Sequence, residues 1–388
     1  MSQFKGRYGF YLALLMFICP IKANQFSDPM DGYLDMGEYL ANNAYGFMPI
    51  PIIVTEPSVG NGIGVAGLLL HESDEQKEKR KKQAAESIDG GAKLLTPALT
   101  VVGGLVTEND TKLGFAGHYR SFNQDSIRYL VGGGYGDINM GFYSQNLPNR
   151  DLNVTLNIKG GGLIQKLQFR VADSPLFIGV SQEFTQSTIH TEGRKLAGII
   201  GDFVNLNPQT SGLGVIAEID TKNSLVFPTN GMHLSTEYMW HKEQFGSDYE
   251  YDTFAIKATN YLPVFQNWTW GLKGMYNSLT SKDIALPVFV YPYIDLRGIP
   301  KYRYQGEAVI AIETQLMWEI TPRWMTSIFG GGGATGENFE QAYQSTGQYT
   351  YGAGFRYTIA RRYGLRVGID LAQSREQTTY YINVGTGL

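Results

Sequence analysis

The sequence predicts an all-β protein, a transmembrane antiparallel β-barrel of sixteen strands with a short N-terminal helical or extended segment. The chain of 388 residues holds 25 Tyr, 20 Phe and 47 Gly but a single Cys, which suggests many short, aromatic-rich strands without disulfides. It begins with the pattern of an export signal, and segments along its whole length alternate apolar and polar residues. No apolar run after residue 24 reaches the roughly 18 residues of a membrane helix.

The first residues predict export. Lys5 and Arg7 precede an apolar run of about a dozen residues, and a small-residue cleavage pattern ends at Ala23. The run is too short to cross a bilayer of roughly 30 Å as a helix, so a cleaved signal peptide over residues 1–23 is favoured over a permanent anchor. Cys19 lies inside this segment. The mature chain therefore has no thiolate metal site, and we expect no cofactor.

The charge balance excludes one class of partner. The chain has 32 Lys and Arg against 36 Asp and Glu, and the signal peptide contains cations but no acids. The mature protein is therefore more acidic still. An acidic chain is a poor ligand for nucleic acid, so we expect no nucleic-acid partner.

Alternation with period two supports the barrel. In residues 362–373, for example, Leu365, Val367 and Ile369 alternate with Arg366 and Asp370. A soluble β-sandwich also alternates. Repetition over the whole chain, aromatic residues near strand ends and charged residues on the same side as glycines favour the barrel. An exported barrel of this kind belongs in the outer membrane of a Gram-negative bacterium.

The pattern predicts fifteen strands and implies one more. The expected strands are 59–70, 97–106, 111–121, 126–138, 160–172, 176–188, 211–220, 231–242, 249–262, 266–279, 304–319, 323–331, 349–358, 363–374 and 377–388. Single-chain bacterial barrels have an even number, and residues 140–158 are the expected place of the sixteenth. The barrel is thus predicted over residues 59–388, after an N-terminal periplasmic or lumenal segment at 24–58.

Two segments outside the strands have their own patterns. Residues 30–43 place apolar side chains in a loosely helical order, which suggests either a short amphipathic helix under or inside the barrel or a simple leader to the first strand. Residues 71–87 carry five cations and five acids without an aromatic residue. We expect a solvated helical or disordered outer loop between the first two strands.

Catalytic and metal patterns are absent from the sequence. It contains no nucleophile elbow, no H-E-x-x-H, no P-loop and no dinucleotide fingerprint. His233 and His241 share one strand face, but eight strand residues span roughly 26 Å, too far for one metal. We therefore predict no enzyme, no catalytic residue and no metal. An outer-membrane hydrolase assembled from several strands is the third and least favoured reading.

Four motifs follow one another in an informative order. Asp220 opens a D-T…P-T-N-G turn that contains Pro228 and Gly231. The loop 295–306, DLRGIPKYRYQG, follows the strand 266–279 and precedes five strands. The motif residues of the loop and the strands after it are Arg297, Gly298, Glu313, Phe329, Gly331 and Gly333.

In this order the motifs resemble the BamA/TamA superfamily of outer-membrane barrels, also called the bacterial surface antigen family. The resemblance implies that the Arg297–Gly298 tip folds back into the lumen, where Arg297 binds Glu313 as a loop latch. Gly331 stands where the family has a strand-thirteen aspartate, so Asp370 is the candidate for a second carboxylate. A guanidinium suits this task because its donors grip carboxylates bidentately.

The resemblance also implies a weak lateral seam between the first and last strands. By the predicted strand positions, the seam residues are Gly62, Gly64, Gly385 and Leu388. Glycine weakens a strand, which is consistent with a labile seam. Alternation places Leu388 toward lipid, in the position where the family has an aromatic residue.

The function implied by the resemblance is to assist the insertion, assembly or translocation of proteins or lipids at the outer membrane. The partners would be outer-membrane lipid and lipopolysaccharide, with unfolded outer-membrane proteins or a periplasmic protein as clients or helpers. The family's periplasmic POTRA modules have no counterpart in the predicted segment at 24–58, which is too short for one. The alternative is a passive pore or a surface-exposed structural barrel without assembly activity.

Overall fold

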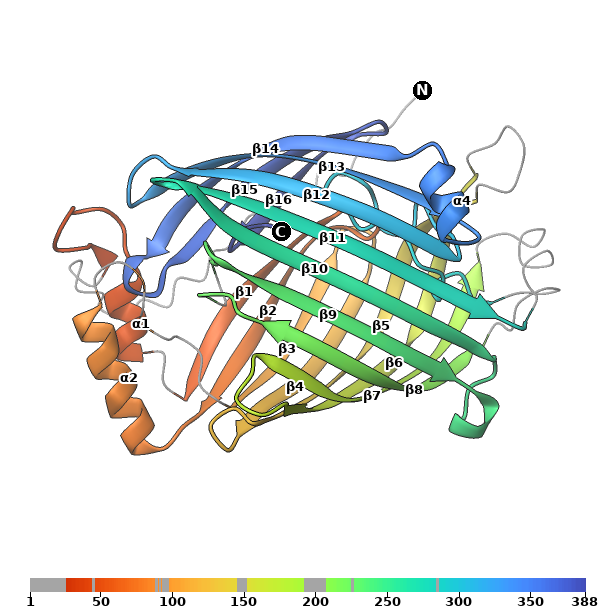
Figure 1. Ribbon diagram of the computed structural model, residues 1–388, viewed down its shortest axis with the longest axis horizontal. Coiled ribbons are helices and arrows are strands. Elements are labelled where there is room, and N and C mark those ends of the chain that lie inside the picture. Colours follow the sequence, from red (N-terminus) through yellow and green to blue (C-terminus); the bar gives the residue numbers. More distant parts are fainter. Residues whose placement is uncertain are drawn as a thin grey trace, which may run out of the picture.

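The computed structural model describes residues 26–43, 46–87, 90, 92, 98–144, 152–191, 207–224, 227–283 and 286–388. They form one antiparallel sheet of sixteen strands, each paired with the next in sequence, curled into a nearly closed barrel (Figure 1). The strands are β1 (Phe47–Glu56), β2 (Gly60–His71), β3 (Ala98–Thr107), β4 (Lys112–Phe122), β5 (Ile127–Ser144), β6 (Leu152–Arg170), β7 (Leu176–Thr191), β8 (Gln209–Asp220), β9 (Gly231–His241), β10 (Tyr251–Phe265), β11 (Trp268–Ser281), β12 (Ala308–Glu319), β13 (Trp324–Gly336), β14 (Gln348–Ala360), β15 (Leu365–Ser374) and β16 (Thr378–Val384).

The helices are short and lie at the barrel ends. They are α1 (Gly37–Asn43), α2 (Asp74–Glu86), α4 (Phe339–Gln344), and the 3-10 turns η2 (Glu243–Phe245) and η3 (Arg361–Tyr363). Among the described residues, no helix has the length and apolar character needed to traverse a bilayer. We call the end where β1 begins and β16 ends the base, at the left of Figure 1, and the opposite end the rim.

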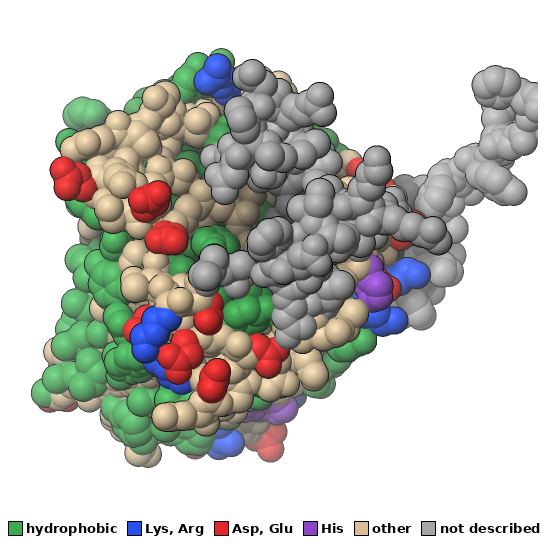
Figure 2. All heavy atoms as spheres, turned by 90° about the vertical axis from the view of Figure 1, so that its right-hand side faces the viewer, with side chains coloured by type: hydrophobic (Ala, Val, Ile, Leu, Met, Phe, Trp, Pro, Cys, Tyr) green, Lys and Arg blue, Asp and Glu red, His purple; other side chains and the backbone are tan. Residues whose placement is uncertain are grey.

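The strands turn apolar side chains outward and polar ones inward. On β14, Tyr349, Tyr351 and Phe355 are exposed on the outer face, while Thr350 and Arg356 are buried on the inner face. This is the inverse of a soluble protein and the pattern of a barrel surrounded by lipid. Figure 2, which looks onto the rim, shows several acidic side chains at this end and hydrophobic side chains along the flank.

All fifteen predicted strands are present, but the sixteenth was predicted in the wrong place. Residues 140–158 contain the outer ends of β5 and β6, which are longer than the pattern indicated. The missing strand is β1, so the barrel starts at residue 47 and not at 59. The predicted signal peptide, 1–23, lies outside the described residues.

Two prolines hid β1 in the sequence. Pro49 and Pro51 lack amide donors, which argues against a central strand. β1 nevertheless pairs with β2 in an unbroken register from Phe47 to Glu56. Residues two apart direct their amides to the same edge, so both prolines belong to the edge of β1 that faces away from β2. That edge makes no ladder with β16 in the described sheet, whose order begins at β1 and ends at β16.

The charged segment 71–87 is a helix, but it is not an outer loop. It forms α2, which connects β2 to β3 at the base, because β1 shifts the strand count by one. Ala84 of α2 packs with Leu40 of α1, with Ala360 at the end of β14 and with Tyr363 in η3. The prediction of a short N-terminal helix is confirmed by α1, which lies beside α2 at the base (Figure 1).

Candidate functional site

The segment between β11 and β12, residues 282–307, is folded into the barrel, and we call it the lumen loop. Its side chains Ile294, Leu296 and Ile299 are buried against Met275 and Val309 on the inner wall. Each buried aliphatic side chain contributes about 1.5–3 kcal/mol relative to an exposed one. The described part of this loop therefore behaves as an internal structural element and not as an exposed loop.

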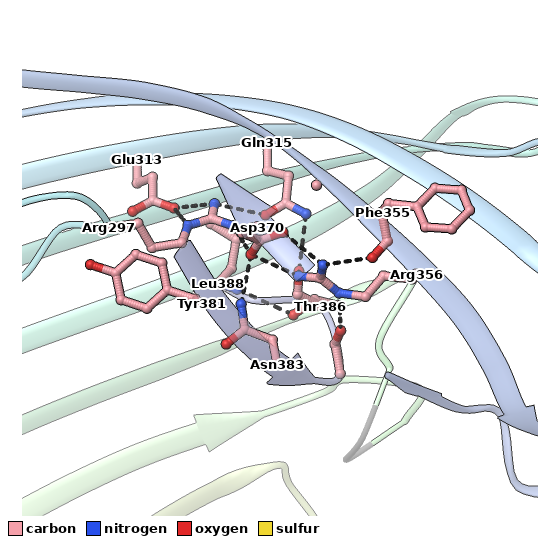
Figure 3. A network of polar contacts seen from close by, with 12 residues as sticks. Arg297, Glu313, Gln315, Phe355, Arg356, Asp370, Tyr381, Asn383, Thr386 and Leu388 are labelled. Atoms are coloured by element: carbon pink, nitrogen blue, oxygen red, sulfur yellow. Dashed lines mark hydrogen bonds and ion pairs between the residues drawn. The ribbon is translucent and has the colours of Figure 1, made fainter. Parts of the chain in front are cut away.

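Arg297 at the tip of the lumen loop holds two acids on separated strands (Figure 3). Its Nε donates to Glu313 Oε1 at 2.7 Å, and its Nη1 donates to Asp370 Oδ2 at 2.9 Å. Its Nη2 donates to Glu313 as well and to Gln315 Oε1 at 2.8 Å. The structure thus brings together the three charged residues of the predicted latch, from the loop, β12 and β15.

The positions beside the latch explain the glycines of the motifs. Gly298 has φ +93°, and a Cβ there would lie 2.8 Å from Thr350 Oγ1. Gly331 is the cross-strand partner of Glu313, and a Cβ there would lie 3.3 Å from Glu313 Cβ. At Gly333 a Cβ would lie 2.8 Å from Ile294 Cγ2. Glycine at 298 and 333 therefore lets the lumen loop approach the wall, and glycine at 331 avoids a close contact with Ile312 and Glu313 of β12.

Phe329, the aromatic residue of the strand-thirteen motif, supports the latch from one side. The Arg297 guanidinium carbon lies 3.5 Å from the centre of the Phe329 ring. A guanidinium over a ring face is attracted by the ring quadrupole, and the attraction is larger when the pair is desolvated. Phe329 is itself buried, so the ring fixes the plane of the guanidinium as well as its position.

A second arginine, which the sequence analysis missed, completes the network. Arg356 on β14 is fully buried and binds Asp370 bidentately, with Nη1–Oδ1 at 2.6 Å and Nη2–Oδ2 at 2.8 Å. Asn383 on β16 donates to the same carboxylate at 2.7 Å. Two arginines therefore balance the two carboxylates, as a buried charge cluster requires. The signal was available, because alternation on β14 turns Arg356 inward.

The C-terminal residues enter the lumen instead of extending β16. Gly385 and Gly387 have φ of 96° and 90°, and they turn the tail, residues 385–388, away from the strand direction. Thr386 O accepts from Gln315 Nε2 at 3.0 Å, and Gly385 O accepts from Arg356 Nε at 3.0 Å. The tail thus supplies carbonyl acceptors to the buried network.

The prediction that Leu388 faces lipid was wrong. Leu388 packs inside the barrel against Phe227, Tyr261, Met317 and Met325. The alternation argument failed because it extrapolated a strand beyond Val384, where the positive-φ glycines end it.

The lumen loop contacts both ends of the sheet. Gly298 N donates to Tyr381 Oη of β16 at 2.9 Å, and Lys301 N donates to Glu56 Oε1 of β1 at 3.3 Å. Tyr304 Oη also donates to Glu376 in the turn before β16. The loop therefore spans the seam between β1 and β16, where the described sheet has no ladder.

Three of the four predicted seam residues are not at the seam, and Leu388 is one of them because it packs inside the barrel. Gly62 and Gly64 lie on β2 and pair with Thr107 and Leu105 of β3. They were assigned to the first strand because β1 had been missed. Gly385 follows β16 and starts the inward turn of the tail.

The residues of the D-T…P-T-N-G motif build the turn between β8 and β9. Asp220 Oδ1 accepts the backbone N–H of Lys222 at 3.0 Å. Gly231 has φ +99°, and a Cβ there would lie 2.3 Å from Thr221 O. Pro228 lies between them and is followed by the start of β9 at Gly231. The motif thus has a structural role at the base.

One cluster has metal-ligand chemistry that the spacing along a strand did not predict. Ligand atoms of Glu218, Asp220 and His233 lie within 4.8 Å of one another, because His233 is the cross-strand partner of Asp220. Arg128 and Lys222 each place a nitrogen 3.7 Å from one of the two carboxylates. These cations compensate both acids, so we interpret the group as an ion-pair cluster.

Residues 105–288 match the model of the Omp85 superfamily domain. This finding, with the fold, confirms the resemblance to the BamA/TamA superfamily. Before β1, the described residues of this barrel form the short helix α1 and no POTRA domain.

Solved barrels have the same architecture. BamA from Haemophilus ducreyi lacking POTRA domains 1–3 is 10% identical with a TM-score of 0.58, over 88% of this chain and 70% of that one. CdiB from Escherichia coli is 11% identical with a TM-score of 0.57, and CdiB from Acinetobacter baumannii is 8% identical with a TM-score of 0.52. Each CdiB match covers 87% of this chain but only 62% and 59% of the CdiB chains, less than two thirds of their length. At these identities the likeness is one of fold. Comparison with curated proteins finds no match.

Proposed function

We propose that this Omp85 barrel resides in the outer membrane and assists the insertion, assembly or translocation of proteins or lipids through a seam between β1 and β16. The observation that carries the proposal is the latch. The tip of the lumen loop binds inward acids on β12 and β15 and contacts β1 and β16 on either side of the seam. A loop that touches both seam strands is placed to sense or control their separation.

The backbone chemistry of the seam supports opening. Pro49 and Pro51 remove two donors from the free edge of β1, and β16 ends at Val384 before the tail turns inward. Separation of the two strands therefore breaks no described ladder. The unpaired groups at both edges are costly in lipid and form a template for an incoming strand. An incoming client segment would satisfy them by β-augmentation.

The filled lumen argues against a passive pore. The lumen loop packs on the inner wall in three apolar clusters, and the tail lies across the latch. A cavity of about 530 Å³ opens at the base, lined in part by Phe227, Arg361 and Arg366. Phe227 also packs in the cluster around Leu388, so this side chain contacts both the cavity and the tail. A client arriving from the base would meet the tail before the latch.

A reversible lock tests the proposal. Cysteine pairs between residues 50–54 of β1 and 380–384 of β16 are screened for disulfide formation, which is clean because Cys19 is removed with the predicted signal peptide. The control is Ile53→Cys with Ile63→Cys, a cross-strand pair that joins β1 to β2, two strands that are already paired in the sheet. Cells that lack the protein are complemented with each variant, and outer-membrane proteins and lipids are quantified with and without reductant.

The seam lock should reproduce the deletion phenotype and recover with reductant, whereas the control lock should behave as wild type. Full complementation by the locked seam variant would contradict lateral opening. Steady ion-selective conductance of the purified protein, unchanged by Arg297→Ala, would instead support the passive pore.

A further inference from the structure

The described N-terminal residues before α1 form a compact turn, which we call the N-terminal hairpin, residues 26–35. Ser27 and Leu34 form an isolated antiparallel bridge. Inside it, Asp28 N donates to Tyr33 O at 2.9 Å, and Gly32 N donates to Asp28 O at 2.8 Å. Two aspartate side chains accept further backbone amides of the turn. The hairpin therefore presents its side chains in fixed directions.

The acids of the hairpin all point toward the barrel. Asp28, Asp31 and Asp35 bind the guanidinium of Arg323, in the turn between β12 and β13, with Nε–Oδ2 of Asp31 at 2.6 Å and Nη1–Oδ2 of Asp35 at 2.5 Å. Arg361 lies 3.7 and 3.6 Å from Asp28 and Asp31. Arg323 is only 2% exposed, so charge-assisted bonds fasten the hairpin to the base.

Three apolar side chains of the hairpin are exposed, whereas Phe26 stacks on Tyr39 of α1. Met30 is 63% exposed, Tyr33 55% and Leu34 54%. A surface segment in contact with water normally has the opposite arrangement, with acids outside and apolar residues inside. Scattered apolar residues need no explanation, but a contiguous group indicates an interaction surface.

The exposed group is continuous with the lipid-facing surface of the barrel. Leu34 O accepts from the hydroxyl of Tyr357, an outward residue near the base end of β14, at 2.6 Å. The Tyr357 ring lies 4.5 Å from Trp324, which stacks on Phe355 at 5.0 Å. Aromatic residues gather in this way at the membrane–water interface of barrels. Figure 1 shows the hairpin, in red at the left, beside the ends of the blue strands.

We propose that the N-terminal hairpin is an interfacial membrane anchor, in which Met30, Tyr33 and Leu34 insert among the headgroups and first acyl carbons of the phospholipid leaflet at the base. The Arg323 clamp neutralises the acids that would otherwise repel an anionic surface. The anchor requires only that the barrel spans a membrane, and it does not depend on assembly activity at the seam. It resembles other interfacial segments in placing apolar and amphipathic side chains in the interface plane.

Site-directed spin labelling tests the anchor. The full mature protein with Met30→Cys carries a nitroxide and is reconstituted in phospholipid vesicles, and its accessibility to oxygen and to a water-soluble nickel complex is measured. The lipid control is Ile63→Cys on the outer face of β2, and the water control is Lys79→Cys on the exposed side of α2. The label at Met30 should resemble the Ile63 label, with a several-fold higher ratio of oxygen to nickel accessibility than at Lys79.

Release of the clamp provides the second measurement. Arg323→Gln, or Asp31→Asn if the first variant folds poorly, should move the Met30 label toward the Lys79 values while heat-modifiability shows a folded barrel. With Arg323 and Asp31 intact, a Met30 label whose ratio of oxygen to nickel accessibility equals that at Lys79 would overturn the proposal. Shielding of the label from both reagents in native membranes but not in pure lipid vesicles would also overturn it, because the surface would then be a protein-docking site.

Discussion

Replacement of Arg297 by alanine should destabilise the barrel strongly, because it leaves a carboxylate buried without a partner. The Glu313 side chain is 1% exposed and that of Asp370 is 0% exposed. Asp370 keeps its bidentate contact with Arg356, whereas the contacts of the Glu313 carboxylate in the described structure are with Arg297. Removal of one partner of a buried ion pair typically costs about 3–5 kcal/mol. We expect Arg297→Ala to fall in this range.

A double variant separates the unpaired charge from lost packing. Arg297→Ala with Glu313→Ala removes both partners, so it should be more stable than Arg297→Ala alone, a coupling that a double-mutant cycle measures. Lys301→Ala is the control, since this residue of the same loop contacts Glu56 through its backbone amide. Unfolding is followed in urea by tryptophan fluorescence and by heat-modifiability. An Arg297→Ala midpoint equal to wild type, or a double variant less stable than the single, would refute the latch as a buried ion pair.

Three further predictions concern the surroundings of the latch and the base. Gly333→Val should cost about 1–3 kcal/mol by overpacking against Ile294, and a rise in proteolytic cleavage of the lumen loop would show it; unchanged protection would contradict the close approach. Leu388→Ala should lower the free energy of unfolding by about 2–3 kcal/mol as a large-to-small change, measured by the urea midpoint. A loss no larger than that for an exposed leucine would show that Leu388 is not packed inside the barrel. The hydrogen bond from Arg323 lowers the pKa of Asp31 below its ordinary value of 3.8. The contacts of Arg323 with the hairpin acids are therefore complete above pH 3.8 and weaken as the pH falls through the lowered pKa of Asp31. A Met30 spin label should gain mobility only in acid. A transition near neutral pH would be inconsistent with titration of this carboxylate.

Strand alternation predicted the wall of the barrel and the inward acids of the latch, whereas the inward fold of the Arg297 loop was predicted from the family resemblance. Strand alternation decides which side chains enter the lumen, and it placed Glu313 and Asp370 there correctly. Pairing across a strand follows less directly, so the contact between His233 and Asp220 was missed. β1 was missed because Pro49 and Pro51 argue against a strand, and an edge strand is the exception that tolerates them.

The conformations of the tail and the N-terminal hairpin could not be predicted because neither segment has the apolar periodicity of a strand or a helix. The direction of the tail depends on positive φ at Gly385 and Gly387, which a glycine permits but does not require. The hairpin acids are separated from Arg323 by almost the full length of the barrel sequence. Contacts of this kind depend on which turns meet at the base, and that is known only when all sixteen strands are in place.

The position of the second acid makes the latch asymmetric. An aspartate at Gly331 would face Glu313 directly across the β12–β13 ladder, and both acids would then depend on Arg297. Asp370 on β15 instead forms ion pairs with both Arg297 and Arg356, and it accepts a hydrogen bond from Asn383 on β16. Withdrawal of the loop would thus leave β15, β16 and the tail joined through Arg356, and Glu313 would be the one acid of the network to lose its cation. The cost of releasing the loop is therefore concentrated on β12, and the last strand can keep its inward anchor while the loop moves.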